Sequence, residues 1–564
     1  MVVGIDLGTT HSLVAFWRDG MAQLVPNALG QLLSPSVVGL DDQGRILVGD
    51  VARQRLHTHP RLTCELFKRY MGSEREVRLG ERRFRPEELS ALVLRSLKED
   101  VERFCGEPVT EAIISVPAYF SDAQRKATRV AGQLAGLRVE RLINEPTAAA
   151  LAYGLQQREE STFLVFDLGG GTFDVSILEM FEGVMEVRAT AGDNFLGGED
   201  FDEVIVEHVL SQLPELRAAL EKDPAHLSPR VRAEARRVRH GLGEQEQLDF
   251  VFQHEDQRWQ LTVARDLFQR LAEPLLERLR LPVQRALRDA RLSAADLDEV
   301  VLVGGATRMP LIRRMVAGLF GRIPAMHLQP DQVVAQGAAV QAALKQRDAA
   351  LEDVVLTDVC PYTLGIETSI ELGRQLESGH YLPIIERNCT VPVSREKSIV
   401  TAQDNQTEVL VRIYQGENRL VKDNIFLGEL SIPVPPRNAE EVELLVRFTY
   451  DIDGLLEADV HIPLTGAHHR LVIENNPGVL GPEEIAQRLQ ALQGLKVHPR
   501  EQQVNTQVLA RVDRLYQESL GDRRAYVAEL GRRFQQALES QDVERIGAVR
   551  EEVEQRLDAL EQGL

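Results

Sequence analysis

Cysteine is scarce in this 564-residue chain, and its four residues, Cys64, Cys105, Cys360 and Cys389, lie far apart in the sequence. No CxxC pair occurs, so neither a zinc site nor a disulfide framework is indicated. Reduced thiols in a cytoplasmic protein are the better interpretation. Long apolar runs are also missing, and no basic region precedes the first strand pattern. We therefore expect neither a membrane span nor a signal peptide.

Positive charge is in deficit, because 65 Lys and Arg residues face 86 Asp and Glu residues, which gives a net charge of -21. Phosphate backbones and anionic lipids repel such a chain, so neither nucleic acid nor membrane is an expected partner. The GxxxxGK[ST] pattern is absent as well, which excludes a P-loop. With 43% hydrophobic and 27% charged residues, the chain is typical of globular proteins, and its length indicates about three to four domains.

A short internal repeat is present. Residues 2–15 and 163–177 each contain an apolar strand, an aspartate, a turn of glycine and threonine, and a returning strand. The two turns read Asp6-Leu7-Gly8-Thr9-Thr10 and Asp167-Leu168-Gly169-Gly170-Gly171-Thr172. Glycines let backbone N–H groups approach phosphate oxygens, and the aspartates indicate a cation between carboxylate and phosphate. One such turn alone is as well explained by an ordinary β-hairpin, whereas two matching copies indicate a clamp for a polyphosphate.

A third glycine turn follows an apolar strand at residues 300–303 and reads Gly304-Gly305-Ala306-Thr307-Arg308. A helix is expected to begin near Pro310, because proline suits the first helical turn. Together with the two repeats, this turn is interpreted as the nucleoside side of one cleft.

Several longer motifs carry a family resemblance. They are Ile5 to Thr10, Val116-Pro117-Ala118-Tyr119-Phe120, Asn144 to Ala150, Asp167 to Asp174, and Leu196 to Asp202. Together they resemble the seventy-kilodalton heat-shock chaperones, of which bacterial DnaK is the type, and the match is dense from residue 1 to about 475. The short segment from Phe250 to Thr262, together with the short C-terminal part, resembles the specialised bacterial HscC type.

The resemblance implies a fold and a division into domains. An α/β actin-like ATPase domain, a duplicated ribonuclease H-like fold, is expected over residues 1–350. An interdomain linker would follow at 351–358, an all-β sandwich that binds peptide at 359–478, and a shortened α-helical lid at 479–564. In the lid, we expect the apolar stripes of Val504, Val508, Val512 and Leu515, and of Ile546 to Leu560, to form bundle core.

The resemblance also implies that the chain hydrolyses ATP to ADP and phosphate. Lys68 would position the attacking water, although alone it would be taken for a solvated lysine. The implied catalytic residues are Lys68, Glu145, Asp167, Thr172 and Asp174. The implied ligands of Mg²⁺, reached through water, are Asp6 and Asp167, and K⁺ is a further cation to be expected. The implied nucleotide-binding residues are Thr9, Thr10, His11, Lys68, Gly170, Gly171, Thr172, Arg236, Arg239, Gly243, Gly305, Ala306, Thr307 and Arg308.

The peptide site and its coupling to the nucleotide are implied in the same way. Unfolded or extended polypeptide would bind at Ile366, Thr368, Ser369, Ile399, Val400, Thr401, Ala402, Val409 and Val411. A relay between nucleotide and linker would use Pro117, Arg125, Arg141 and Asp358, and Arg141 would also serve a J-domain co-chaperone. We expect a cytoplasmic, monomeric chaperone with roles in protein folding and the stress response.

Four departures from the DnaK pattern matter. Ser369 stands where DnaK arches a methionine over the peptide, and Leu372 to Tyr381 is expected to be a longer loop. Arg236, Arg239 and Gly243 replace Glu, Lys and Ser, so a ribose-accepting carboxylate is missing from that helix and weaker nucleotide binding is expected. The segment from Phe250 to Thr262 is expected to be too short for the hairpin that an exchange factor uses, so no GrpE-type factor is expected.

Two other functions remain as alternatives. A small-molecule kinase, such as a sugar kinase, can share the phosphate turns, but it has no use for a peptide-binding β-domain. An actin-like filament protein is the third possibility, and the C-terminal half weighs against it.

Overall fold

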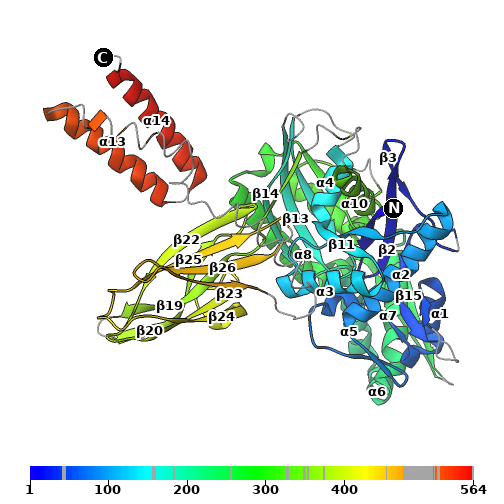
Figure 1. Cartoon of the computed structure of the whole chain (residues 1–564). Coiled ribbons are helices and arrows are strands. Elements are labelled where there is room, and N and C mark those ends of the chain that lie inside the picture. Colours follow the sequence, from blue (N-terminus) through cyan, green and yellow to red (C-terminus); the bar gives the residue numbers. More distant parts are fainter. Residues whose placement is uncertain are drawn as a thin grey trace. The chain divides into compact units, whose positions relative to one another are not determined.

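The computed structural model describes residues 1–473 except for 29, 41–45, 155–159, 182–183, 255–256, 326–328, 347–350, 352–354, 373–374 and 453, and further on 508, 512, 515–516, 521–540 and 542–561. The chain divides into two compact units, Met1–Pro361 and Tyr362–Leu564 (Figure 1). Unit 1 is mixed α/β, and unit 2 contains β-sheets followed by helices.

Unit 1 is built around two large sheets with the same arrangement at their centres. In the first sheet the strand order is β11-β10-β1-β2-β3. Strand β1 lies antiparallel to β2 and parallel to β10. The bounds are β1 Val2–Leu7, β2 His11–Arg18, β3 Met21–Leu24, β10 Glu111–Val116 and β11 Arg138–Asn144, and the short β4 Ser34–Pro35 pairs with β2.

The second sheet of unit 1 has the order β17-β12-β13-β14-β18. Strand β12 lies antiparallel to β13 and parallel to β17, which repeats the pattern of β1. The bounds are β12 Ser161–Leu168, β13 Phe173–Phe181, β14 Val184–Asp193, β17 Glu299–Val303 and β18 Val355–Val359. The two sequence repeats are thus equivalent hairpins at the centres of two related sheets.

Helices pack against these sheets. The strands are almost continuously apolar, as expected for strands buried on both faces. The helices of unit 1 are α1 Asp50–Thr58, α2 Pro86–Cys105, α3 Asp122–Leu134, α4 Glu145–Gly154, α5 Gly198–Gln212, α6 Pro214–Lys222, α7 Pro224–Gly241, α8 Arg265–Ala290, α9 Pro310–Phe320 and α10 Val333–Lys345. The expected helix start at Pro310 is confirmed, with proline in the first turn of α9.

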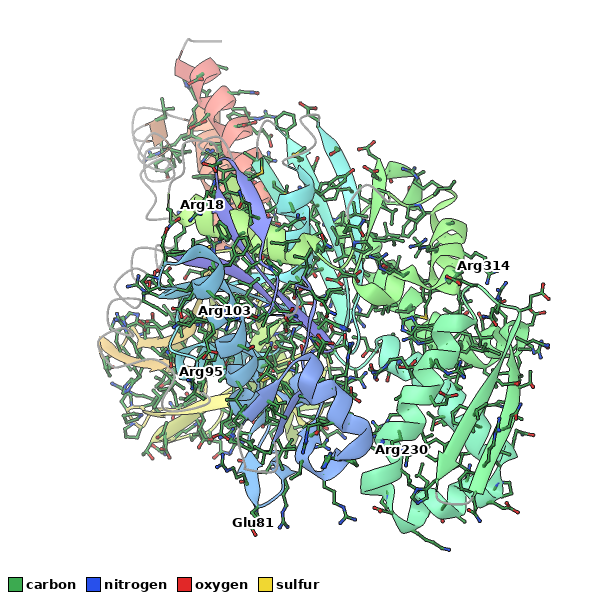
Figure 2. The ribbon with its side chains drawn as sticks, turned by 90° about the vertical axis from the view of Figure 1, so that its right-hand side faces the viewer. Arg18, Glu81, Arg95, Arg103, Arg230 and Arg314 are labelled. Atoms are coloured by element: carbon green, nitrogen blue, oxygen red, sulfur yellow. The ribbon has the colours of Figure 1, made fainter. Side chains whose placement is uncertain are left out.

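Helix α2 shows how these helices divide between core and solvent. Leu89, Val93 and Leu97 are fully or almost fully buried in a core beneath the first sheet. Arg95 and Arg103 project from the opposite side of the helix (Figure 2). This division follows from the 3.6-residue period of an amphipathic helix.

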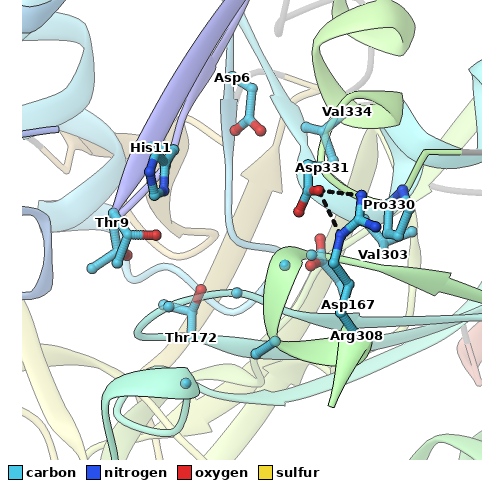
Figure 3. A pocket seen from close by; sticks show the side chains of 18 of the residues that line it. Asp6, Thr9, His11, Asp167, Thr172, Val303, Arg308, Pro330, Asp331 and Val334 are labelled. Carbon is cyan, nitrogen blue, oxygen red and sulfur yellow. Dashed lines mark hydrogen bonds and ion pairs between the residues drawn. The ribbon is translucent and has the colours of Figure 1, made fainter. Parts of the chain in front are cut away.

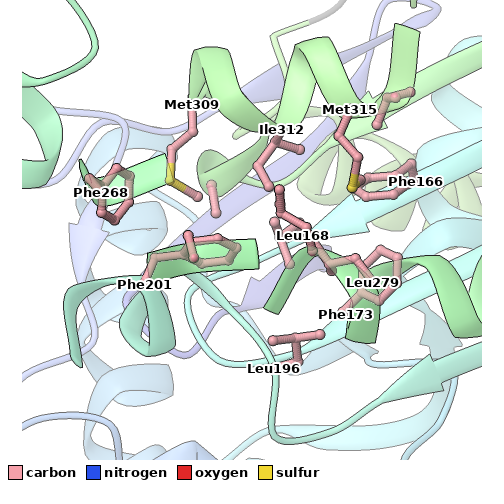
Figure 4. Packing of buried hydrophobic residues seen from close by; sticks show 14 of the residues in the cluster. Phe166, Leu168, Phe173, Leu196, Phe201, Phe268, Leu279, Met309, Ile312 and Met315 are labelled. Atoms are coloured by element: carbon pink, nitrogen blue, oxygen red, sulfur yellow. The ribbon is translucent and has the colours of Figure 1, made fainter. Parts of the chain in front are cut away.

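The largest core lies beneath the second sheet. Phe166 and Phe173, one from each strand of the second hairpin, meet with ring centroids 4.6 Å apart. Phe201 of α5 and Ile312 of α9 pack against them (Figure 4). Burial of each of these side chains contributes about 1.5–3 kcal/mol, so this core fixes the second hairpin against α5 and α9.

Smaller hairpins complete unit 1. The three strands β5 Val38–Leu40, β6 Ile46–Val48 and β7 Thr63–Cys64 form one sheet, and β8 Val77–Leu79 pairs with β9 Arg82–Phe84. Strands β15 Gln247–His254 and β16 Gln257–Ala264 also pair, from Gln247↔Ala264 to His254↔Gln257. Residues Phe250 to Thr262 thus belong to a short hairpin, and the expectation that they lack room for the hairpin that an exchange factor uses stays a prediction. Phe252 and Trp259 are buried within this pair, which explains why even a short segment folds back.

Unit 2 contains two four-stranded sheets, β20-β19-β23-β24 and β22-β25-β26-β27. Each sheet has one buried apolar face, for example Ile366 and Ile413 in the first and Val446 and Val460 in the second. This is the pattern of a β-sandwich. The bounds are β19 Leu364–Leu372, β20 Gln375–Ile385, β22 Val393–Val400, β23 Glu408–Gln415, β24 Ile425–Pro433, β25 Glu443–Tyr450, β26 Leu456–Ile462 and β27 Ala467–Val472, with the short β21 Thr390–Val391 between β20 and β22.

Leu372 ends strand β19 and Gln375 to Tyr381 lie in strand β20, where a loop had been expected. Strands β19 and β20 continue their pairing up to Leu372↔Gln375, with an irregularity between Thr368 and Ile370. The prediction of a covering loop is therefore wrong for the described residues.

The C-terminal helices are α13 Gly521–Glu539 and α14 Val543–Glu561. Val508, Val512 and Leu515 pack with Ile546, Val553 and Leu557, and Val549 and Leu560 adjoin them. These stripes are bundle core, as predicted, whereas Val504 lies outside the described residues. Over the part of the chain that the structure describes, no helix is both long enough and apolar enough to span a bilayer.

Candidate nucleotide site

The two repeated turns face each other across one cavity of about 310 Å³ in unit 1. Asp6, Thr9 and His11 come from the β1–β2 hairpin, and Asp167 and Thr172 come from the β12–β13 hairpin opposite (Figure 3). The predicted residues that line the cavity are Asp6, Thr9, Thr10, His11, Lys68, Glu145, Asp167, Gly170, Thr172, Arg236, Arg239, Gly305, Ala306 and Arg308. Gly171, Asp174, Gly243 and Thr307 are not among its lining residues.

Close backbone approach explains the glycines of these turns. A Cβ atom on Gly170 would lie 2.4 Å from Cγ2 of Thr10, so the two turns can meet only if this residue has no side chain. Gly304 has φ +82°, and a Cβ there would lie 2.3 Å from the carbonyl oxygen of Leu168. Both positions thus leave the walls of the cavity to backbone groups, which is the kind of cradle that a polyphosphate fits.

Lys68 and Glu145 form a buried ion pair between the hairpins. The Lys68 Nζ donates to Glu145 Oε1 at 2.8 Å, and the two side chains are only 3% and 11% exposed. Lys68 lies in a 3₁₀ turn, Phe67–Tyr70, and Glu145 is the first residue of α4. Glu145 is therefore both the first acid of a helix and a residue that lines the cavity.

Around the Lys68–Glu145 pair, the negatively charged side chains outnumber the single lysine. Burial, followed by the charge of Glu145, raises the pKa of Asp6 to about 7, and the same two causes raise the pKa of Asp174 to about 7. Burial also raises the pKa of Asp167 well above its usual value. Such shifts arise where carboxylates share too little positive charge, so the cluster is suited to a cation.

The fit to a divalent cation can be tested on the carboxylate oxygens. Asp167 Oδ2 is buried and accepts no hydrogen bond from the described residues, whereas Asp6 Oδ1 accepts one from Ser115 Oγ at 3.0 Å. Among the described residues, no group of three or more His, Cys, Asp or Glu side chains is placed to hold a metal directly. Asp6 and Asp167 thus fit a cation that keeps most of its water, as Mg²⁺ does.

The third turn closes the far end of the cavity. The Gly304 N–H donates to the carbonyl of Pro330 at 2.9 Å, and Arg308 pairs with Asp331 (Figure 3). The Thr307 hydroxyl donates to the carbonyl of Gly304 at 2.7 Å. The Thr307 hydroxyl therefore stabilises the turn, and the role of Thr307 as a nucleotide contact stays a prediction.

Helix α7 contributes Arg236 and Arg239. Arg236 Nη2 donates to both oxygens of Glu199 at 2.8 Å, and its Nε donates to Asp202 at 3.2 Å. Arg239 Nε donates to the other oxygen of Asp202 at 2.5 Å. Gly243 lies beyond the end of the helix, near Pro310, and is not among the residues that line the cavity, so its role in nucleotide binding stays a prediction.

His11 is held neutral near the same end. Burial, and then the charges of Arg53 and Arg236, lower its pKa to about 4. A neutral imidazole can both donate and accept a hydrogen bond, so His11 adds a polar contact to the first hairpin without adding charge.

A chain of hydrogen bonds leads from Asp174 towards the predicted linker. The backbone N–H groups of Ala118 and Tyr119 donate to Asp174, each at 3.2 Å. Arg125 donates to the carbonyl of Ala118 at 3.1 Å and to Asn144 Oδ1 at 2.6 Å. The second phosphate turn is held by a further contact, in which Arg69 Nε donates a hydrogen bond to the carbonyl of Gly171 at 3.4 Å.

The chain of contacts ends at strand β18. The Asn144 amide donates to Asp358 Oδ2 at 2.8 Å, and the Thr147 hydroxyl donates to the same oxygen at 3.3 Å. Burial raises the pKa of Asp358, while the charges of Arg125 and Arg141 oppose that rise. The predicted relay residues Arg125, Arg141 and Asp358 thus lie in one network, with the buried Pro117 beside Ala118. Asn144, which the sequence did not single out, joins them.

The predicted peptide residues divide into three groups by burial. Ile366 and Val411 are almost completely buried, and Thr401 is buried as well. Ser369, Val400 and Ala402 are exposed. Thr368, Ile399 and Val409 are partly buried. The first group therefore belongs to the sandwich core, and the exposed group is what a ligand could reach.

Several residues that line the cavity were not predicted from the sequence, chiefly Glu199, His240 and Asp331. Glu199 lies inside the family motif Leu196 to Asp202, but the motif did not predict which ligand or residue Glu199 contacts. Asp331 follows Pro330 in a segment with no distinguishing pattern. These residues are recognised only by their contacts in the folded structure, because no local spacing in the sequence predicts them.

Comparisons with known proteins agree with this arrangement. The family described as Hsp70 protein matches residues 2–79 and 73–563 of the chain. The chaperone protein DnaK of Thermotoga petrophila is 41% identical over 486 residues, which cover 84% of this chain and 80% of that protein. The chaperone protein DnaK of Thermosipho africanus is 41% identical over 485 residues, covering 84% and 79%. That of Thermosipho melanesiensis is 40% identical over 485 residues, covering 84% and 80%. The chain therefore belongs to the Hsp70 protein family.

Proposed function

We propose that this chain is an ATP-dependent molecular chaperone, in which ATP hydrolysis in unit 1 controls the binding and release of extended polypeptide by unit 2. The observation that carries the proposal is the buried pair of Lys68 and Glu145 between two phosphate-type turns. Membership of the Hsp70 family and the names of the chaperone relatives support it. The two related sheets of unit 1 fit an actin-like, duplicated ATPase fold.

The chemistry is transfer of a phosphoryl group to water. In such reactions, positioning and charge neutralisation supply most of the catalysis. Lys68 would neutralise phosphate charge, and Glu145 would orient and accept a hydrogen bond from the attacking water. Asp174 would hold the strand end at Ala118 in place, and the Thr172 hydroxyl would donate to a phosphate oxygen.

Mg²⁺ bound with the nucleotide would supply the remaining positive charge. Asp6 and Asp167 would hold its water ligands, and K⁺ is a second cation that the same carboxylates suit. Thr9, Thr10 and backbone N–H groups of both turns would bind the phosphates. We expect slow turnover, because a chaperone uses hydrolysis as a timer.

Unit 2 would bind unfolded or extended segments at the exposed predicted residues Ser369, Val400 and Ala402. Main-chain hydrogen bonds with a strand edge are the mode expected for an extended ligand. We further propose that a J-domain co-chaperone acts near Arg141 and that no GrpE-type factor is needed. The chain would act as a monomer in the cytoplasm.

The experiment measures phosphate release by the purified chain with and without an unfolded polypeptide and a J-domain. We expect slow basal hydrolysis that rises severalfold when both are added. A panel of sugars is assayed in parallel for phosphorylated product. Sugar phosphate, formed without any response to polypeptide, would replace the chaperone by the kinase alternative.

A further inference from the structure

Two histidines stack on the outer face of the sheet β22-β25-β26-β27 in unit 2. His461 of β26 lies directly opposite His468 of β27. Their rings are nearly parallel, with an angle of 10° between the planes and 4.2 Å between the centroids. Val460 and Ile462, the neighbours of His461 in β26, are buried, whereas His468 has 52% of its side chain exposed. Because side chains alternate between the two faces of a strand, the histidine pair lies on the solvent side of the sheet.

A carboxylate fixes the tautomer of one ring. His468 Nδ1 lies 3.2 Å from Asp459 Oδ1, and an ionised carboxylate only accepts hydrogen bonds, so Nδ1 carries the hydrogen. In the neutral ring, Nε2 then presents its lone pair to an electrophile. Arg470 Nε donates to the other oxygen of Asp459 at 2.9 Å and holds the carboxylate in place. Histidines that bind metals in proteins donate their second ring nitrogen to a carboxylate in this way.

The charge next to the histidine pair favours a cation. Two acids, Glu457 and Asp459, lie 3.9 Å and 2.9 Å from the single guanidinium group of Arg470, so negative charge is in excess. Imidazole nitrogen suits Zn²⁺, Ni²⁺ and Cu²⁺, whereas Mg²⁺ takes oxygen ligands. The pair therefore differs in ligand class from the aspartates of the nucleotide cavity.

The two rings are close enough to share one ion. Cβ atoms of directly opposite residues in an antiparallel pair are about 4.5–5.5 Å apart, and a bond from Zn²⁺ to a histidine nitrogen is about 2.0–2.1 Å long. His461 is partly exposed, so both rings have room to turn until the nitrogens converge. Over the described part of the chain, no group of three or more His, Cys, Asp or Glu side chains is placed to hold a metal. The ion would therefore take two imidazoles from the protein and complete its shell with water.

We propose that His461 and His468 form a two-histidine site for a divalent cation of the class of Zn²⁺, Ni²⁺ and Cu²⁺, with Asp459 as the positioning residue. The site goes beyond the proposed function and does not depend on it. Strand β27 is at the end of the strand order of its sheet. A bound ion links this edge strand to β26 in addition to the backbone hydrogen bonds, so occupancy stabilises β27. Imidazole must be neutral to bind a metal, so the affinity falls as the pH is lowered.

The test titrates the full chain, first freed of metal with EDTA, with Ni²⁺ and follows binding by calorimetry. We expect a site that His461→Gln and His468→Gln each remove. His469→Gln is the matched control, because His469 lies in the same strand opposite the buried Val460 and so points to the other face. Asp459→Asn should weaken binding by about tenfold or more. Binding that persists in His461→Gln and His468→Gln, or that His469→Gln removes equally, would overturn the proposal.

Amide exchange of the unaltered chain is an independent measurement. Ni²⁺ should slow the exchange of Ala467 to Val472 severalfold. It should leave Ile425 to Pro433 of β24 unchanged, because this strand is at the end of the other sheet. The comparison needs no variant, so it decides even if a substituted chain does not fold. Equal slowing of both strands, or of neither, would contradict the link between β26 and β27.

Discussion

At the scale of single residues, the site is governed by an imbalance of charge. One buried lysine faces Glu145 and three aspartates with raised pKa values. A buried ion pair is costly to break, because the remaining charge has no partner. Catalysis and stability are therefore coupled at Lys68, and experiments on it need a control for stability.

Replacing Lys68 by alanine should lower ATP hydrolysis by at least about 100-fold, because an electrostatic contact to the reacting phosphate is lost. ATP binding should stay within about tenfold, since the turns and α7 remain. Single-turnover hydrolysis and equilibrium binding measure the two effects. Lys126→Ala is the matched control, because Lys126 is also buried and pairs with Asp122 at 2.7 Å outside the cavity. Hydrolysis at the unaltered rate in Lys68→Ala would remove the role given to this residue.

The pKa of Asp6, raised to about 7, predicts a pH dependence of stability in the chain without metal or nucleotide. A carboxyl whose folded-state pKa is raised contributes stability below its unfolded pKa and loses it as the pH rises through the folded pKa. Between pH 5 and pH 8, the stability of Asp6→Asn should therefore rise relative to that of the unaltered chain by about 3 kcal/mol, which corresponds to the two pH units between pH 5 and the raised pKa of about 7. Urea denaturation in EDTA measures the difference, and a gap that is constant with pH would contradict it.

At the scale of elements, strand β18 joins the second sheet through its backbone and through one side chain. It pairs in parallel with β14 at Val184↔Val355, Met185↔Leu356 and Glu186↔Thr357. Asp358 adds the contacts with Asn144 and Thr147. A pairing this short depends on its side-chain anchor, since few ladder hydrogen bonds hold it.

Replacing Asp358 by alanine should loosen β18 and weaken the communication between nucleotide and peptide. We expect the amide exchange of Leu356 to Val359 to accelerate by about tenfold or more. A factor of this size corresponds to the free energy of one or two hydrogen bonds to a carboxylate. Hydrogen exchange with mass spectrometry measures it, and the basal ATPase should change little. Asp296→Ala, at an exposed helix-cap position, is the control. Unchanged protection of β18 would show that the backbone pairing alone suffices.

The elements show what the sequence could and could not predict. The hairpins at Asp6 and Asp167 and the helix start at Pro310 follow from local patterns of glycine, proline and apolar residues, and the structure has them there. The β15–β16 hairpin was missed, because Phe252 and Trp259 stabilise a short pair by burial. The contacts of Glu199 and Asn144 were not predicted, because their partners lie far away in the sequence and no rule about local spacing applies to them.

At the scale of the whole molecule, the chain has two units with separate cores. Phe201 belongs to the core of unit 1, and Phe448 is buried in the sheet β22-β25-β26-β27 of unit 2. Separate cores allow separate cooperative transitions, in which case a single unfolding free energy does not describe the chain.

Scanning calorimetry should therefore resolve two transitions, and two matched substitutions should assign them. Phe201→Ala and Phe448→Ala each remove a fully buried ring, which costs about 3–5 kcal/mol in the unit concerned. We expect each variant to lower one transition by several degrees and leave the other in place, and Mg²⁺ with ADP to raise the transition that Phe201→Ala lowers. One transition that both substitutions lower equally would show that the units unfold together.

The parallel pairing of β18 with β14 has a consequence for competition. A strand edge has one row of free N–H and C=O groups and can hold only one partner strand at a time. While β18 occupies Val184 to Glu186, that stretch of edge is closed to any other extended chain. Without β18, the same row of groups would be free to pair with another extended strand. The short segment from Val355 to Val359 therefore protects this part of the sheet from pairing with other chains.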